Sequence, residues 1–254
     1  MKILEREIGD QLDGLFEEVV LSLANAFAKK AVNEDEGEAI EKKLSILAQD
    51  DGLLSRIQWV EDNPYIYIRS DIPTHAMPHV LGTALCHVQQ KIDQFPDVVQ
   101  NDNEKELDGS LLVRIALKEL LMSLNAEEKM KNIQFDIDWE DKNRHQGFKD
   151  LLSMLDRDQD DSFVSTDHPT HQFFAVTYAK FSLIHPPKMW SGLKTQIKND
   201  YPEFVESGNK ILEIIDSSGF KDADSCLKSL TSIRDELAMR PYTLILDRRD
   251  SSYY

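Results

Sequence analysis

The segment from Tyr65 to Gln90 constrains the fold of this chain most, because its hydrophobic pattern changes abruptly. Ile66 and Ile68 alternate with other side chains, as in a half-buried strand. A turn at Ile72-Pro73 follows, and residues 74–94 then contain the apolar run of a predicted helix. A strand that leads directly into a helix predicts an α+β fold.

The rest of the chain is predicted to be mainly α-helical. RIQWV and YIYIR flank the turn EDNP and predict a β-hairpin. QNDNEKELDGS predicts a loop, and YTLILD after Pro241 predicts a closing strand or an extended tail. Helices are expected over 3–30, 35–49 and 74–94, after the loop at 100–110, near 145–155, and over 170–184, 188–199, 202–217 and 222–238.

The predicted helix at 74–94 carries a run that is similar to a zinc-peptidase motif. Zincin metallopeptidases place H-E-x-x-H on a helix, where two imidazoles on one face share a zinc ion and the Glu activates the bound water. LGTALCHV resembles the zincin run L-x-H-E-L-x-H-V. In this comparison Thr83 replaces the first His, Ala84 replaces the Glu, and His87 remains.

The order of strand, turn and helix also resembles peptidases of the ImmA/IrrE type. In that group the third zinc ligand is a Glu on a following helix, about thirty residues downstream, and Glu119 stands at a comparable spacing. The resemblance implies a zincin-like core with His87 and Glu119 as the residual metal ligands. It also implies a protein without peptidase activity, since a catalytic zinc needs three protein ligands and a base.

His75 and His79 extend the polar positions of the same segment and could line a cleft there. Pro78 is best tolerated in the first turn of a helix, so His75 is expected to precede or cap the helix. His79, Thr83 and His87 form one stripe, but His79 and His87 are about 12 Å apart along the axis, too far to share one ion. A zinc site formed by His75, His79 and a carboxylate from elsewhere is one alternative. The other is a polar stripe partly satisfied by hydrogen bonds, with first-turn capping and surface solvation.

Three further segments contain candidate ligands. Asp156, Asp158 and Asp160 match alternating positions of a calcium loop, but Asp161 stands where that loop needs Gly, so an acidic solvent loop is the alternative. STDHPTH is similar to Thr-His-Pro turns of some membrane zinc peptidases, and a helix N-cap at Asp167 or Thr170, with His168 exposed, also accounts for it. His185 is expected to end a helix as an imidazolium that interacts with the helix dipole.

Composition limits the classes of function. The net charge of −17 disfavours nucleic-acid binding, which depends on Lys and Arg. A basic partner would complement this charge, and a solvated acidic surface is the alternative. No run is long and apolar enough to span a membrane, and the N-terminus lacks a signal peptide, so a cytoplasmic protein is expected. Cys86 and Cys226 are expected to be reduced thiols.

The sequence therefore predicts a mainly α-helical α+β protein. Residues 1–144 would form a zincin-like core and residues 145–254 a helical layer packed on it, with a single domain as the alternative. The function expected is that of an inactive zincin-like protein that binds a protein or peptide partner and needs no cofactor. The alternatives are an atypical zinc metalloprotein that uses His87 and Glu119, and an acidic helical inhibitor or immunity-type protein.

Overall fold

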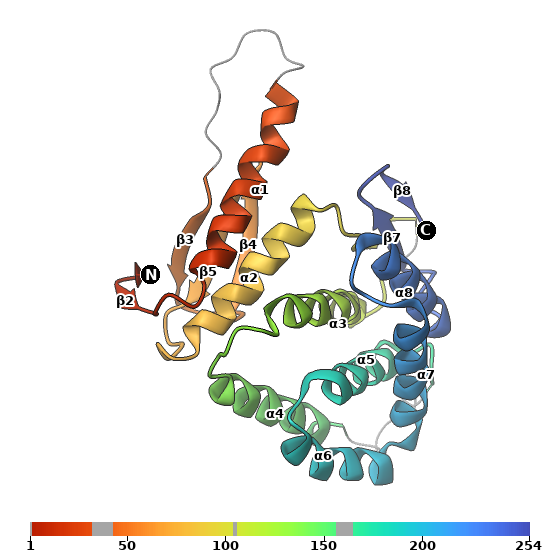
Figure 1. Cartoon of the computed structure of the whole chain (residues 1–254). Coiled ribbons are helices and arrows are strands. Elements are labelled where there is room, and N and C mark those ends of the chain that lie inside the picture. Colours follow the sequence, from red (N-terminus) through yellow and green to blue (C-terminus); the bar gives the residue numbers. More distant parts are fainter. Residues whose placement is uncertain (1, 32–42, 104–105, 156–164) are drawn as a thin grey trace. The chain divides into compact units, whose positions relative to one another are not determined.

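The protein is an α+β protein in which helices predominate (Figure 1). We describe it from a computed structural model, over residues 2–31, 43–103, 106–155 and 165–254. Contacts divide the chain into a first unit, residues 1–93 and 126–140, and a second unit, residues 94–125 and 141–254. The boundary at residue 144 stays a prediction, since compactness alone does not define a domain.

The first unit contains a three-stranded sheet in the order β3-β5-β4. Its strands are β3 (Ser45–Gln49), β4 (Ser55–Val60) and β5 (Asn63–Arg69), and the central β5 is parallel to β3 and antiparallel to β4. Val60 pairs with Asn63, so the turn is only Glu61-Asp62, and both of these residues have positive φ. The predicted hairpin is confirmed, with a two-residue turn.

Two predicted helices near the N-terminus were wrong in part. Helix α1 spans Asp13–Ala31 and begins ten residues later than expected, because β1 (Lys2–Ile3) and β2 (Arg6–Glu7) form a small hairpin first. The helix expected over 35–49 is replaced at its end by β3, where parallel pairing with β5 overrides local preference. Residues 35–42 lie outside the described residues.

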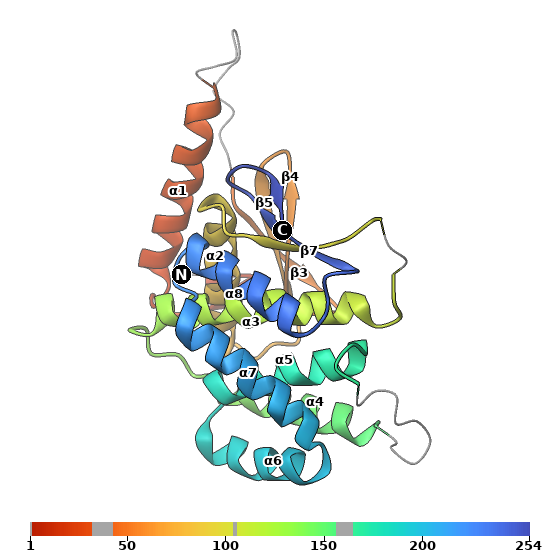
Figure 2. The same ribbon diagram turned by 90° about the vertical axis from the view of Figure 1, so that its right-hand side faces the viewer.

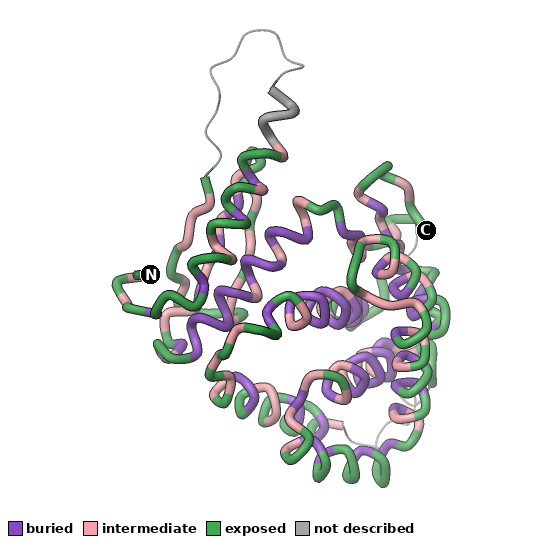
Figure 3. The backbone as a smooth tube through the Cα atoms, viewed as in Figure 1, coloured by how far each residue is buried: buried purple, intermediate pink, exposed green. Residues whose placement is uncertain are grey.

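Helix α2 (Met77–Ile92) confirms the helix predicted over 74–94 and is the most buried element of the first unit (Figure 3). It packs on β4 and β5 and lies beside α1. Gly82 allows close packing there, because a Cβ at this position would lie 2.7 Å from Met130 Sδ and 3.2 Å from a methyl group of Leu12. Only residues that tolerate burial or find polar partners fit on such a helix.

The second unit is mainly helical (Figure 2). Three short strands pair in the order β6-β7-β8, so YTLILD does form a closing strand. The helices predicted from residue 170 onwards are confirmed, whereas α4 begins seven residues before the helix expected at 145. The elements not yet bounded are α3 (Ser110–Met130) and α4 (Asp138–Ser153), which have residues in both units, and β6 (Asp97–Gln100), α5 (Pro169–Ile184), α6 (Pro187–Asp200), α7 (Pro202–Ser218), α8 (Ala223–Glu236), β7 (Thr243–Asp247) and β8 (Ser252–Tyr253).

The core of the second unit joins residues that are distant in the sequence. Leu117 and Leu121 of α3 belong to the same buried cluster as Ile211 of α7 and Leu230 of α8. Helices α5 and α7 share the most extensive contact in this unit. Among the described helices, none is long and apolar enough to cross a membrane.

Candidate functional site

The positions on α2 that correspond to the zincin motif differ in burial. Ala84, at the position of the general base, is 1% exposed and belongs to the apolar core of the first unit. Thr83 and His87 are half-buried, and the intervening Cys86 packs with Ala126 and Met130. A catalytic carboxylate at position 84 would therefore lie in a hydrophobic core.

Glu119 belongs to the second unit, whereas His87 belongs to the first. Glu119 lies in the middle of α3 and accepts a hydrogen bond from Ser123 Oγ at 3.3 Å. Lys180 Nζ of α5 in turn donates to Ser123 Oγ at 3.0 Å. The carboxylate thus takes part in a polar chain between α3 and α5, and its role as a residual ligand stays a prediction.

His79 is buried and lies between two carboxylates of the first unit. Its Nδ1 is 2.9 Å from Glu140 Oε1 and its Nε2 is 3.2 Å from Glu127 Oε1. The ring of Phe135 packs edge-on against the imidazole. His79 is only 3% exposed, so surface solvation does not apply to it, and its two contacts agree with a polar stripe partly satisfied by hydrogen bonds. The exposed His75 precedes the helix as expected.

The two carboxylates determine the charge of His79. Burial by itself lowers the pKa of the imidazole, but the hydrogen bonds and charges of Glu127 and Glu140 outweigh it and raise the pKa to about 9. The carboxylates bind opposite ring nitrogens, so they do not converge on a point where a metal ion could sit. The arrangement is an imidazolium held between two carboxylates, and it joins α2 to residues 127 and 140.

We expect this cluster to stabilise the fold in a pH-dependent way. The folded pKa lies above the unfolded value, so the stabilisation is fully present below pH 6.5 and is lost as the pH rises through 9. Its size is about 1–3 kcal/mol, since half-exposed Glu127 is partly screened by solvent. Urea unfolding at pH 6, 7.5 and 9 should show this loss for wild type and a much flatter profile for His79→Gln. Exposed His75→Gln is the control and should keep the wild-type profile.

A second histidine pair lies in the second unit. His145 Nδ1 of α4 is 3.1 Å from His185 Nε2 at the end of α5, and the two rings are 7° from parallel with centroids 5.3 Å apart. These values fit an edge-to-edge N–H···N hydrogen bond, in which one nitrogen carries the proton and the other accepts it. The pair is therefore a hydrogen bond between α4 and the end of α5.

His185 ends α5 as predicted, but the expected imidazolium was wrong. Burial, followed by the positive charges of His145 and Arg144, lowers the pKa of His185 to about 4. Its Nδ1 lies 4.0 Å from Asp141 Oδ1, and the ring of Phe181 packs against it. The side chain is therefore neutral at pH 7, so the helix dipole is not what holds it there.

The lowered pKa of His185 predicts a loss of stability in acid. The unfolded chain binds a proton between pH 6.5 and 4 that the folded chain does not, so the stabilisation is present above pH 6.5 and is lost as the pH falls through 4. The expected loss is on the order of 2 kcal/mol. His185→Gln should flatten the difference between midpoints of thermal unfolding at pH 7 and pH 4.5. An unchanged difference in this variant would contradict the assignment.

Two other candidate segments are resolved differently. Asp156, Asp158 and Asp160 lie outside the described residues, so the calcium loop stays a prediction. The N-cap of α5 is His168, whose Nδ1 accepts a hydrogen bond from the Thr170 amide at 3.2 Å. The expected caps at Asp167 or Thr170 were therefore wrong, because the imidazole itself reaches the second amide of the helix.

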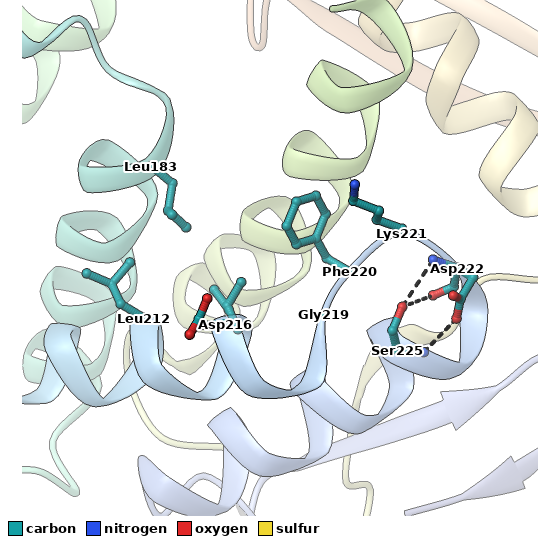
Figure 4. Close-up of a pocket in the computed structure, with 9 residues that line it drawn as sticks. Leu183, Leu212, Asp216, Gly219, Phe220, Lys221, Asp222 and Ser225 are labelled. Carbon is teal, nitrogen blue, oxygen red and sulfur yellow. Dashed lines mark hydrogen bonds between the residues drawn. The ribbon is translucent and has the colours of Figure 1, made fainter.

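The second unit contains a pocket that no sequence motif indicates. It lies between the end of α5, the C-terminal half of α7 and the turn into α8, and its volume is about 430 Å³ (Figure 4). Side chains from the three segments surround it and most of its wall is apolar. The lining residues are Leu183, Leu212, Ile215, Asp216, Gly219, Phe220, Lys221, Asp222 and Ser225.

Local sequence signals build the turn beside the pocket. Gly219 ends α7 with φ 83°, a conformation that side chains other than glycine rarely adopt. Asp222 then starts α8 through a capping box, in which its carboxylate accepts from the Ser225 amide and Ser225 Oγ accepts from the Asp222 amide. The chain is thereby reversed within four residues.

Side chains from other helices hold the carbonyl groups of this turn. Ser229 Oγ donates to Gly219 O at 2.6 Å, and Asn125 Nδ2 reaches both Phe220 O and Lys221 O, at 3.3 and 3.0 Å. Cys226 Sγ also contacts Phe220 O at 3.1 Å. The buried thiol is inert in this position, because burial raises the pKa of Cys226 to about 12. The turn is thus preformed, as expected of a binding site.

Asn125→Ala tests whether the hydrogen bonds from Asn125 hold the turn in place. Loss of the amide removes the donor for Lys221 O and one of the donors for Phe220 O, so the free energy of unfolding should fall by about 1–2 kcal/mol. The backbone amides of the turn should also exchange hydrogen faster. Asn209→Ala, at an exposed position of α7, is the matched control and should change neither quantity. Equal effects of the two variants would contradict this role of the Asn125 hydrogen bonds.

Comparison of the chain with protein-family models, with curated proteins and with solved structures gives no match. The resemblance to zincin peptidases therefore stays a prediction. Within residues 2–31, 43–103, 106–155 and 165–254, no group of three or more His, Cys, Asp and Glu side chains is arranged to hold a metal ion.

Proposed function

We propose that this protein acts by binding a partner and not by hydrolysis, and that the pocket beside the α7–α8 turn is its binding site. The observation that carries the first part is the position of Ala84. The residue that would supply the catalytic base of a zincin is replaced by a methyl group, and that methyl group is packed in the core of the first unit. Peptide hydrolysis by that mechanism needs a base beside a metal-bound water.

The pocket supports the second part of the proposal. It combines an apolar wall with a few polar groups at its edge and a preformed turn, which are the usual features of a ligand site. Leu183 is 44% exposed although it lines the pocket, so covering it with a ligand would remove apolar surface from water. The buried histidines, in contrast, already have polar partners within the fold.

Metal analysis separates this proposal from the atypical zinc metalloprotein. Protein purified without a tag or chelator should contain far less than one zinc per chain, for wild type and for His87→Ala alike. Nearly one zinc per wild-type chain, lost in His87→Ala, would contradict the proposal and establish a ligand set around His87.

The binding arm uses free indole as a probe of the apolar wall. We expect indole to shift the amide resonances of residues 219–222 in a two-dimensional NMR spectrum, and Leu212→Asp to abolish these shifts. Shifts confined to other residues would place the binding site elsewhere. The metal analysis decides whether the protein has a zinc site at His87, and the indole titration decides whether this pocket is a binding site.

A further inference from the structure

The chemistry of the pocket edge indicates which ligands it can accept. Asp216 and Asp222 contribute two carboxylates and Lys221 contributes one ammonium group, so the edge carries a net charge of −1 in a chain of net charge −17. Figure 4 shows Asp216 between Leu212 and Phe220, and the residue is exposed. A cationic group is therefore favoured beside the apolar wall, and an anionic group is opposed.

The N-terminus of α8 would otherwise favour an anion, because its free amides carry partial positive charge. Asp222 already fills that position, since its carboxylate accepts a hydrogen bond from the Ser225 amide at 2.8 Å. This hydrogen bond holds the pKa of Asp222 below its ordinary value, so the carboxylate stays charged at pH 7. The helix end is thus satisfied internally, and its capping carboxylate adds to the negative charge of the edge.

We propose that the pocket holds one large apolar side chain of a partner protein, in a segment where Lys or Arg flanks that side chain. The proposal rests on the proposed binding function and specifies the ligand. Leu183, Leu212 and Phe220 contact the apolar group, and Asp216 faces the neighbouring cation. A peptide segment fits better than a small molecule held inside the pocket. The backbone of such a segment would lie at the mouth of the pocket and would cover the exposed face of Leu183.

Three fluorescein-labelled peptides test the ligand chemistry, with the central sequences Lys-Phe-Lys, Lys-Ser-Lys and Glu-Phe-Glu. Fluorescence anisotropy should show the tightest binding for Lys-Phe-Lys. Lys-Ser-Lys should bind at least tenfold more weakly, because it lacks the apolar group, and Glu-Phe-Glu should not bind measurably, because its charge is opposed. Equal binding of the two lysine peptides would overturn the proposal, since it would reflect only the net charge of the protein.

Variants locate the binding on the protein. Leu183→Gln should weaken Lys-Phe-Lys binding about tenfold, whereas Leu111→Gln, at a leucine of α3 that is 56% exposed and does not line the pocket, should leave binding unchanged. Asp216→Asn should weaken binding of Lys-Phe-Lys about threefold and improve that of Glu-Phe-Glu. Equal weakening by Leu183→Gln and Leu111→Gln would overturn the assignment to the pocket.

Failure of this inference can be told apart from failure of the proposed function. If indole shifts the turn resonances but Lys-Phe-Lys binds no better than Glu-Phe-Glu, the pocket is a binding site and the basic ligand is wrong. If indole shifts no resonance of residues 219–222 and no peptide binds, both the site and the ligand are wrong.

Discussion

Burial of helix α2 is the constraint on which the structure of the first unit depends. The helix packs on strands β4 and β5 and beside α1, so almost every position on it must be apolar or must find a polar partner. His79 meets this requirement through Glu127 and Glu140. Ala84 and Cys86 meet it by being small and apolar. The same burial places Ala84, at the position of the zincin base, in the apolar core of the first unit.

The two buried histidine clusters solve the same problem in opposite ways. His79 keeps its proton because two carboxylates compensate for the loss of water, whereas burial, followed by the charges of His145 and Arg144, lowers the pKa of His185 and leaves it neutral. Both ring nitrogens of His79 contact carboxylates, and Nε2 of His185 shares a hydrogen bond with His145. Buried and perturbed histidines often mark active sites, but here their partners indicate a structural role.

Local signals predicted much of the fold. Alternation in β5, the proline in the first turn of α2, Gly219 after α7 and the apolar period of the later helices each specify an element from adjacent residues. Strand β3 was missed because it is fixed by parallel pairing with β5, a partner twenty residues away. The candidate sites were predicted less well. The partners of His79 lie 48 and 61 residues downstream, and no spacing rule connects them.

The pocket could not be predicted from the sequence for a related reason. Its wall combines Leu183 of α5 with Leu212 of α7 and Phe220 of the turn, and each of these residues by itself is typical of an amphipathic helix or a helix end. What makes them a site is the tight reversal at Gly219, fixed by donors from Asn125 and Ser229, which leaves Phe220 beside an apolar groove. A turn held by side chains of two helices, α3 and α8, has already lost the conformational entropy that a ligand would otherwise have to remove. Binding therefore needs no rearrangement there, and the charge of the nearby carboxylates is left to decide which apolar ligands can approach.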